Sequence, residues 1–146
     1  MTTPAVERAP APGAFFALFV LTLMNMLNYV DRWVPSAVKE LFKGDLQLTD
    51  AQTSWPLTAF IVVYMLASPL FGALAERKSR RVLIAFGVAS WSLATAAAAF
   101  STGFISLLIA RAAVGIGEAA YATLAPSVLA DFFPPEKRNQ IGRAHV

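Results

Sequence analysis

Long stretches without charged residues constrain this chain more than any other feature. Uncharged runs extend over residues 14–30, 51–75 and 82–110. About 20 apolar residues cross the hydrocarbon core of a bilayer, so the third run holds one span and the beginning of another. Each run is also several times longer than an ordinary strand of about five or six residues. The sequence therefore predicts four transmembrane helices and an all-α membrane protein.

Composition agrees with this class and excludes others. The chain is 57% hydrophobic and 14% charged, whereas a soluble domain carries roughly a quarter charged residues. It has no cysteine, which rules out a disulfide framework or a thiolate metal site. No nucleophile elbow, zinc motif or phosphate loop is present. We therefore expect no enzyme activity, cofactor or metal, and a net charge of +3 requires no nucleic acid.

The chain is expected to consist of a cytoplasmic tail and one helical bundle. The tail, residues 1–13, holds three prolines and few large apolar side chains. Thr49-Asp50-Ala51-Gln52 resembles a capping box that begins the second span. Pro35 is tolerated in the first span if neighbouring groups satisfy the carbonyl that it frees. The spans are predicted at about residues 14–38, 54–75, 82–100 and 104–133.

The distribution of lysine and arginine predicts the orientation. The tail, the connection after the second span and the C-terminal segment hold eight of these residues, and the first connection holds only Lys39 and Lys43. Cytoplasmic loops carry the excess of positive charge. We therefore expect both ends of the chain to be cytoplasmic in a multi-pass cell membrane protein, which in a Gram-negative source means the inner membrane.

Charged residues inside the spans indicate function. Arg111 and Glu118 are seven residues apart in the fourth span, so they lie on nearly the same helix face, separated by roughly 10 Å. Asp31 and Arg32 close the first apolar run. Because charges in hydrocarbon are costly, all four are candidates for proton coupling or substrate binding along a solute pathway.

Two asparagines of the first span are further polar candidates. Asn25 and Asn28 precede the charged pair by one to two helical turns. Each asparagine could line the cavity or form hydrogen bonds between helices, and the sequence leaves both roles open.

Two segments resemble the major facilitator superfamily. The connection after the second span combines Gly72, Glu76, Arg77 and Arg81 in the spacing of that superfamily's signature loop, with glutamate in place of the commoner aspartate. The segment from Arg111 through Gly115 and Gly117 is similar to the superfamily's fourth-helix pattern. Glu118, Ala125-Pro126-Ser127, Ala130-Asp131-Phe132-Phe133, Arg138 and Asn28-Tyr29-Val30-Asp31-Arg32 resemble its Spinster branch.

The resemblance implies an alternating-access transporter, in which two helix bundles rock about a central site. Asp31 and Glu118 are then the expected proton-carrying acids. Arg111 either switches their protonation or holds the anionic head of a substrate. The signature loop would act as a conformational latch, for which we expect a contact between Arg77 and Asp131. Gly115 and Gly117 would allow close helix packing.

The resemblance also implies that the chain is an N-terminal fragment. A superfamily member has twelve spans in two six-helix bundles, so residues 14–140 would form part of the first bundle. The missing C-terminal part of the same transporter is then an expected partner, beside the bilayer, a small organic solute and protons. Residues 141–146 look like translated sequencing-adapter read-through, and we expect them to be non-native.

The function expected from these observations is proton-coupled secondary transport of an organic solute, amphipathic or anionic. Two alternatives treat the chain as a complete four-span protein. One is a dimeric small exporter, although small multidrug transporters carry their membrane glutamate in the first span and this chain carries Glu118 in the fourth. The other is a scaffold that does not transport, which would leave the intramembrane charges without a role.

Overall fold

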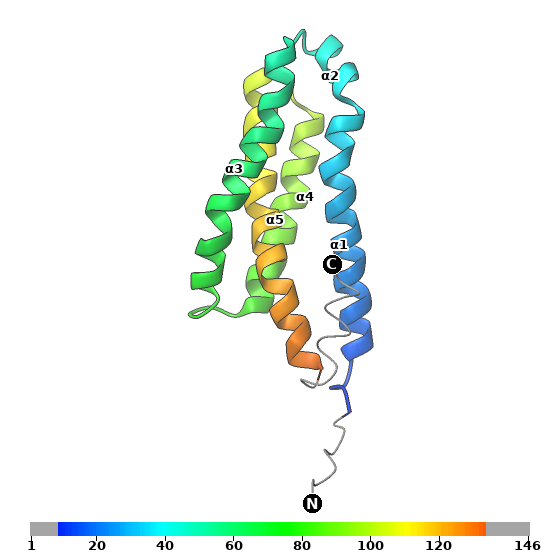
Figure 1. Cartoon of the computed structure of the whole chain (residues 1–146), viewed down its shortest axis with the longest axis vertical. Helices are drawn as coiled ribbons and strands as arrows, with labels where there is room; N and C mark the ends of the chain where they lie inside the picture. Colours follow the sequence, from blue (N-terminus) through cyan, green and yellow to red (C-terminus); the bar gives the residue numbers. More distant parts are fainter. Residues whose placement is uncertain (1–8, 134–146) are drawn as a thin grey trace, which may run out of the picture.

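The computed structural model describes residues 9–133, and this part of the chain is helical throughout without a strand (Figure 1). Four helices are long and apolar enough to cross a membrane, which confirms the predicted all-α membrane fold. The five helices are α1 (Ala14–Ala37), α2 (Lys39–Asp45), α3 (Asp50–Leu74), α4 (Arg80–Ala99) and α5 (Phe104–Phe132).

The connection between the first two spans is more ordered than its polar sequence suggested. It contains the short helix α2, and the Lys43 ammonium group donates a hydrogen bond to the Asp50 carboxylate at the start of α3. The predicted capping box is confirmed, because Gln52 N donates to Thr49 Oγ1 over 3.3 Å and Thr49 N donates to Gln52 Oε1 over 3.0 Å. These contacts extend α3 back to Asp50, four residues before the expected start of the span.

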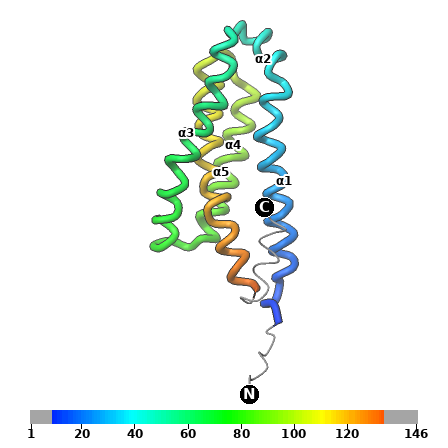
Figure 2. The backbone as a smooth tube through the Cα atoms, viewed as in Figure 1, coloured from blue at the N-terminus to red at the C-terminus, as the bar shows by residue number. Residues whose placement is uncertain are grey.

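Helix α5 is the centre of the bundle (Figure 2). It packs along both α3 and α4, whereas α1 contacts it much more sparsely. Fourteen residues of α5 are buried, against three in α1, four in α3 and five in α4. A helix that is buried on nearly every side has no polar face, so the residues of α5 are apolar or small around most of its circumference. Of its three charged residues, Arg111 and Glu118 are therefore placed inside the protein, and Asp131 is exposed in its last turn.

Glycines set the closest helix approaches. A Cβ atom added to Gly117 would lie 2.5 Å from Gly87 O and 2.6 Å from Trp91 Cβ, both in α4. A Cβ atom added to Gly115 would lie 2.7 Å from Phe60 O in α3. Only a residue without a side chain fits such distances, and small residues drive helix packing where water supplies no hydrophobic force.

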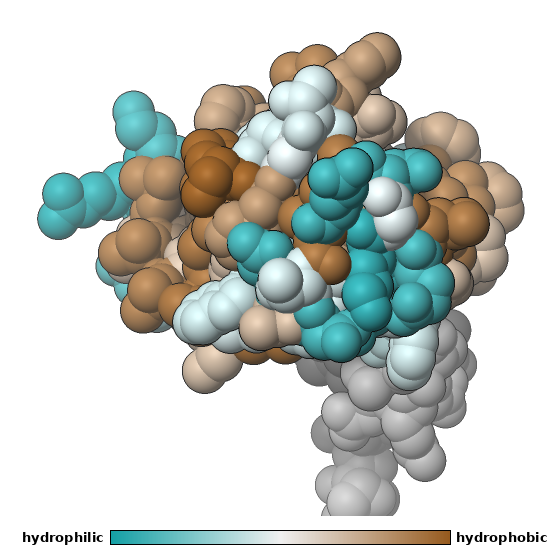
Figure 3. Space-filling model, turned by 90° about the horizontal axis from the view of Figure 1, so that it is seen from above, coloured by the Kyte–Doolittle hydropathy of each residue, from teal (hydrophilic) through white to brown (hydrophobic). Residues whose placement is uncertain are grey.

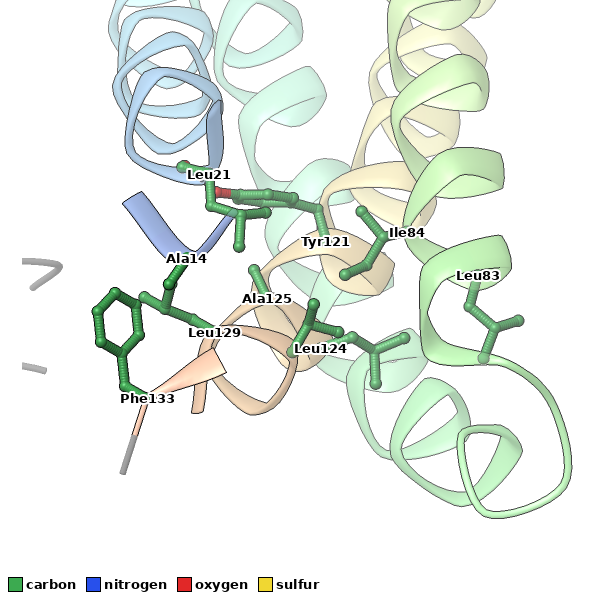
Figure 4. Close-up of a cluster of buried hydrophobic side chains, with 10 residues drawn as sticks. Ala14, Leu21, Leu83, Ile84, Tyr121, Leu124, Ala125, Leu129 and Phe133 are labelled. Atoms are coloured by element: carbon green, nitrogen blue, oxygen red, sulfur yellow. Dashed lines mark hydrogen bonds between the residues drawn. The ribbon is translucent and has the colours of Figure 1, made fainter. Parts of the chain in front are cut away.

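The lower part of α1 is attached to α5 by backbone and tyrosine contacts. Ala11 N donates a hydrogen bond to Phe132 O over 2.9 Å, and Tyr121 donates its hydroxyl to Leu21 O. The same region holds an apolar cluster in which Leu21 of α1 and Ile84 of α4 surround Tyr121 (Figure 4). Outside this cluster, α1 depends on polar contacts for its position.

The outer surface divides into a polar end and apolar sides. Seen from the α2 end, hydrophilic residues gather over the tip of the bundle and hydrophobic residues surround it (Figure 3). Large side chains such as Phe16 of α1, Leu70 of α3 and Leu93 of α4 are each about 70% exposed, at 73%, 69% and 72%. A belt of this kind suits contact with lipid tails or with further helices.

Candidate functional site

Polar and charged side chains from two helices meet halfway along the bundle. Helix α1 contributes Asn28, Asp31 and Arg32, and α5 contributes Arg111 and Glu118. We call these five residues the charged centre. All four predicted charged candidates are thus brought together, although α1 and α5 are separated by most of the chain.

Arg32 and Glu118 form the principal ion pair of the charged centre. Arg32 Nε donates to Glu118 Oε2 over 2.9 Å, and the Glu118 side chain is fully buried whereas that of Arg32 is 32% exposed. The guanidinium group also lies over the rings of Tyr64 and Phe60 in α3, at 4.9 and 5.6 Å from their centroids. Three helices therefore converge on one cation.

Asp31 is bound by a residue that sequence reasoning missed. Trp91 of α4 donates its indole N–H to Asp31 Oδ2 over 2.5 Å. Trp91 is buried, at 5% exposure, whereas Trp33 and Trp55 are 71% and 55% exposed. Tryptophan usually lies at membrane boundaries, so a tryptophan in the middle of a predicted span was the available signal. An indole N–H is a donor only and needs an acceptor when buried.

Arg111 has weaker partners than Arg32 in the charged centre. Its side chain is 5% exposed, and one terminal nitrogen donates to the backbone oxygen of Asp31 over a long 3.4 Å. Its guanidinium also lies 5.5 Å from the ring centroid of Phe60. Its Nε has no hydrogen-bond partner among residues 9–133. Arg111 does approach Asp31 as expected, but it meets the backbone, while the two carboxylates bind Trp91 and Arg32.

The two asparagines occupy different environments. Asn28 is 3% exposed and lies next to the Glu118 carboxyl group. Within the described part of the chain, Asn28 Nδ2 and Glu118 Oε1 are both buried without a hydrogen-bond partner. Asn25 is half-buried one turn earlier in α1. Asn28 is therefore positioned to bind Glu118 after a small movement, since it supplies the donors that a carboxylate needs.

The charged centre carries two cations and two acids at membrane depth. An ion pair is tolerated in a low-dielectric interior only while each charge keeps its partner. Protonation of Glu118 would leave Arg32 with only the two aromatic rings. The ion pair therefore joins α1 and α5 through the charge of one buried carboxylate.

The connection between α3 and α4 contacts the end of α5. Arg80 lies 3.7 Å from Asp131, and the guanidinium of Arg81 lies 5.7 Å from the ring centroid of Phe132. The expected contact between Arg77 and Asp131 is thus replaced by one from Arg80. Arg77 lies in the exposed turn before α4, where the chain has not yet turned back toward α5.

The other members of the predicted latch are less engaged. Glu76 is exposed in the same turn. Gly72 is half-buried, and a Cβ atom added there would meet only Thr123 Cγ2 at 4.0 Å, so this glycine does not set a close approach. Residues 134–146, with Arg138 and the expected read-through tail, lie outside the described residues.

Neither a metal site nor a nucleophile is evident at the charged centre. Among residues 9–133, no group of three histidine, cysteine or acidic side chains could hold a metal ion. The charged centre and the adjacent Trp91 offer guanidinium, indole and amide donors, and the acceptors are two carboxylates and the Asn28 amide oxygen. This chemistry suits binding of anions and exchange of protons.

Buried intramembrane charges within a bundle of spanning helices define a polytopic membrane protein with a polar interior. The sequence profile of the Major Facilitator Superfamily matches residues 21–141, and the chain belongs to this superfamily of membrane transporters.

Similar proteins come from the Spinster branch. The chain is 38% identical to Protein spinster homolog 1 of Homo sapiens over 124 residues, 84% of this chain and 24% of the human protein. It is 35% identical to Protein spinster of Drosophila melanogaster over 127 residues, 87% of this chain and 21% of that protein.

A solved structure agrees with these relatives. The crystal structure of a bacterial homolog to the human lysosomal transporter Spinster, in an inward-facing and unoccupied conformation, matches with a TM-score of 0.85 and 31% identity. The match covers 94% of this chain and 29% of that protein. The chain thus spans about a quarter of the length of the relatives that it matches.

Proposed function

We propose that this chain is the N-terminal part of a secondary transporter that moves an organic solute, amphipathic or anionic, by alternating access coupled to protons. In this proposal Asp31 and Glu118 carry the protons. Both ends of the described part lie on the cytoplasmic side of a cell membrane, and the rest of the transporter completes the pathway.

The observation that carries the proposal is the ion pair between Arg32 and Glu118. The Glu118 side chain is fully buried, and its partner comes from another spanning helix. A buried carboxylate loses its favourable environment if that cation moves away, and it then binds a proton. Relative movement of α1 and α5 would therefore exchange a proton as the cavity changes the side that it faces.

The test is a flux measurement on a full-length transporter that contains this segment. In proteoliposomes with an imposed pH gradient, Glu118→Gln should abolish gradient-driven solute accumulation, because glutamine keeps the volume and removes the titratable proton. Equilibrium exchange of solute without a gradient should persist. Glu40→Gln, a matched change on the exposed surface of α2, should leave both fluxes unchanged. Gradient-driven accumulation that survives Glu118→Gln would refute coupling through this acid.

The contacts at the α3–α4 connection support a second element of the proposal. Gly72, Glu76, Arg77 and Arg81 belong to a latch that closes on Asp131 at the end of α5. Arg80 is the member that lies within 3.7 Å of Asp131 in this conformation. A surface ion pair contributes little to stability, so its role would be to bias the two transport conformations.

A further inference from the structure

Pro35 interrupts the hydrogen-bond ladder of α1 just beyond the charged residues Asp31 and Arg32. Proline has no backbone N–H, and its ring clashes with the carbonyl group four residues earlier, which here belongs to Asp31. The backbone oxygen of Asp31 therefore lacks the donor that a regular helix would give it. A carbonyl group without a donor is costly at membrane depth, so a neighbouring element must supply one.

Arg111 of α5 supplies a donor to this oxygen. Its Nη2 donates to the backbone oxygen of Asp31 over 3.4 Å, and Arg111 is buried, at 5% exposure. An N–H donor usually lies about 2.9–3.0 Å from its acceptor, so this bond opens or tightens with a small movement of either helix. The guanidinium group of Arg111 thus faces the oxygen that Pro35 frees.

The two parts of α1 on either side of Pro35 are held in different ways. The three buried residues of α1, which are Ala14, Leu21 and Asn28, all precede the proline. We call residues 36–46 the distal segment; it comprises the end of α1 and all of α2 (Figure 1). No residue of α2 is buried, and a cavity of about 410 Å³ lies between this segment and α4. Packing within the described part of the chain therefore does little to fix the direction of the distal segment.

The residues just before Pro35 are fixed by side-chain contacts. Trp91 of α4 donates to the carboxylate of Asp31 over 2.5 Å. Arg32 donates to the carboxylate of Glu118 in α5 over 2.9 Å. Both contacts join α1 to other helices before the ladder is interrupted. A change in the direction of α1 would therefore start at the proline and carry the distal segment with it.

We propose that Asp31, Pro35 and Arg111 form a pinned hinge, in which the guanidinium group of Arg111 sets the direction of the distal segment by holding the backbone oxygen that Pro35 frees. Arg111 is then a positioning residue, and this role requires neither a change in its charge nor contact with solute. The meaning of the hinge for transport rests on the proposed function, and the hinge deepens that proposal by naming the point at which α1 bends.

Spin-label distances in the full chain, reconstituted in lipid nanodiscs, test the hinge. The chain has no cysteine, so pairs of labels can be placed without background. Leu41→Cys in α2 and Leu93→Cys in α4 form the reporting pair, at residues that are 69% and 72% exposed. The control pair combines Leu93→Cys with Phe16→Cys, at a residue of α1 that lies before the hinge and is 73% exposed.

Removal of the proline should straighten α1. The stretch from position 35 to position 41 is about 9 Å long at helical rise, so loss of a kink of about 20° should shift the reporting distance by about 3 Å in Pro35→Ala. The control distance should stay the same. Pro69→Ala, at an exposed proline of α3, is the matched control variant and should change neither distance.

Removal of the guanidinium group should release the distal segment. Arg111→Met should broaden the distribution of the reporting distance, because no group then holds the freed oxygen. In the Pro35→Ala background the same change should have no further effect, because the restored backbone N–H completes the ladder. If Arg111→Met alone does not fold, Pro35→Ala should restore its folding for the same reason, and absence of this rescue would count against the hinge.

Three outcomes would overturn the inference. An unchanged distribution in Arg111→Met would mean that the guanidinium group does not hold the distal segment. Equal broadening with and without Pro35 would mean that Arg111 acts through another contact, such as the ring of Phe60. A control distance that shifts together with the reporting distance would mean that α1 moves as one rigid rod. No solute flux or pH gradient enters these measurements, so failure here and failure of the Glu118→Gln experiment are distinguishable.

Discussion

Gly117 is the residue at which a single methyl group should have the largest effect on packing. A Cβ atom added to Gly117 would lie 2.5 Å from Gly87 O and 2.6 Å from Trp91 Cβ. Backbone atoms of a neighbouring helix cannot rotate away from such a contact. Gly117→Ala should lower the free energy of unfolding by about 1–3 kcal/mol, as overpacked cores do. Thermal unfolding in detergent, followed by circular dichroism, measures the change.

Gly72→Ala is the matched control. The same methyl group there meets only Thr123 Cγ2 at 4.0 Å, which is ordinary van der Waals contact, and alanine is the better helix former by about 1 kcal/mol. We expect an unchanged or slightly higher melting temperature. Equal destabilisation by the two variants would contradict the assignment of Gly117 to a close helix crossing.

Trp91 and Asp31 carry a prediction about the attachment of α1. Trp91→Phe keeps an aromatic ring but removes the indole donor, leaving the Asp31 carboxylate without its 2.5 Å hydrogen bond. Loss of a partner by a buried acceptor costs about 1–3 kcal/mol, and the cost should be at the low end of this range because Asp31 is half-buried. Because α1 packs sparsely on the other helices, hydrogen exchange measured by mass spectrometry should accelerate in α1 more than in α5. Trp55→Phe, at a residue 55% exposed, should leave exchange unchanged; acceleration spread evenly over all helices would argue against a specific attachment.

At the scale of single elements, the start of α3 is held by a cap and by an exposed ion pair, and the two should differ in strength. Thr49→Ala removes the side chain that accepts from Gln52 N and should cost about 0.5–2 kcal/mol. Lys43→Met removes the exposed pair with Asp50 and should change the melting temperature little. Thermal unfolding of both variants compares them directly. A larger effect of Lys43→Met would reverse this ranking.

The pH range over which the ion pair contributes follows from the pKa of Lys43. Asp50 raises the pKa of Lys43 above its ordinary value. A raised pKa means that the contribution of the pair is complete below the pKa of an unfolded lysine and is lost only as the pH rises through the higher folded value. The difference in stability between the native chain and Lys43→Met should therefore be constant between about pH 6 and 9, since an unfolded lysine titrates near 10.4.

The elements themselves were largely predictable, because spans and caps depend on neighbouring residues. Run length marks a transmembrane helix, and Thr49 and Gln52 are only three residues apart. Helix α2 was missed because a seven-residue helix is below the length at which periodicity is informative. The Arg80 contact was missed for a different reason. Which of several neighbouring arginines reaches Asp131 depends on where the helix begins to turn, and boundaries are the least predictable feature of a helix.

For the whole molecule, the contact at the α3–α4 connection should affect the balance of conformations. In a full-length transporter containing this segment, Arg80→Ala should shift the populations of inward-facing and outward-facing states, because it removes the cation 3.7 Å from Asp131. Arg77→Ala should shift them less. Spin-label distances across the two bundles measure the populations, and solute affinity in a fixed conformation should be unchanged. A larger shift from Arg77→Ala would restore the contact first expected from the sequence.

The sequence by itself predicted the four helices of residues 9–133 that are long and apolar enough to cross a membrane, and the charges that these helices carry, because hydrophobicity over about 20 consecutive residues marks such a helix. Only the tertiary structure decided which partners those charges have. Arg32 reaches Glu118 across 86 residues of sequence and Trp91 reaches Asp31 across 60. Such pairs depend on how the helices rotate and cross. The close packing at Gly115 and Gly117 sets this geometry, and it involves segments far apart in the sequence. The same packing leaves Arg111 in the wall of a cavity, where the hydrogen bond that it donates to the backbone oxygen of Asp31 is 3.4 Å long.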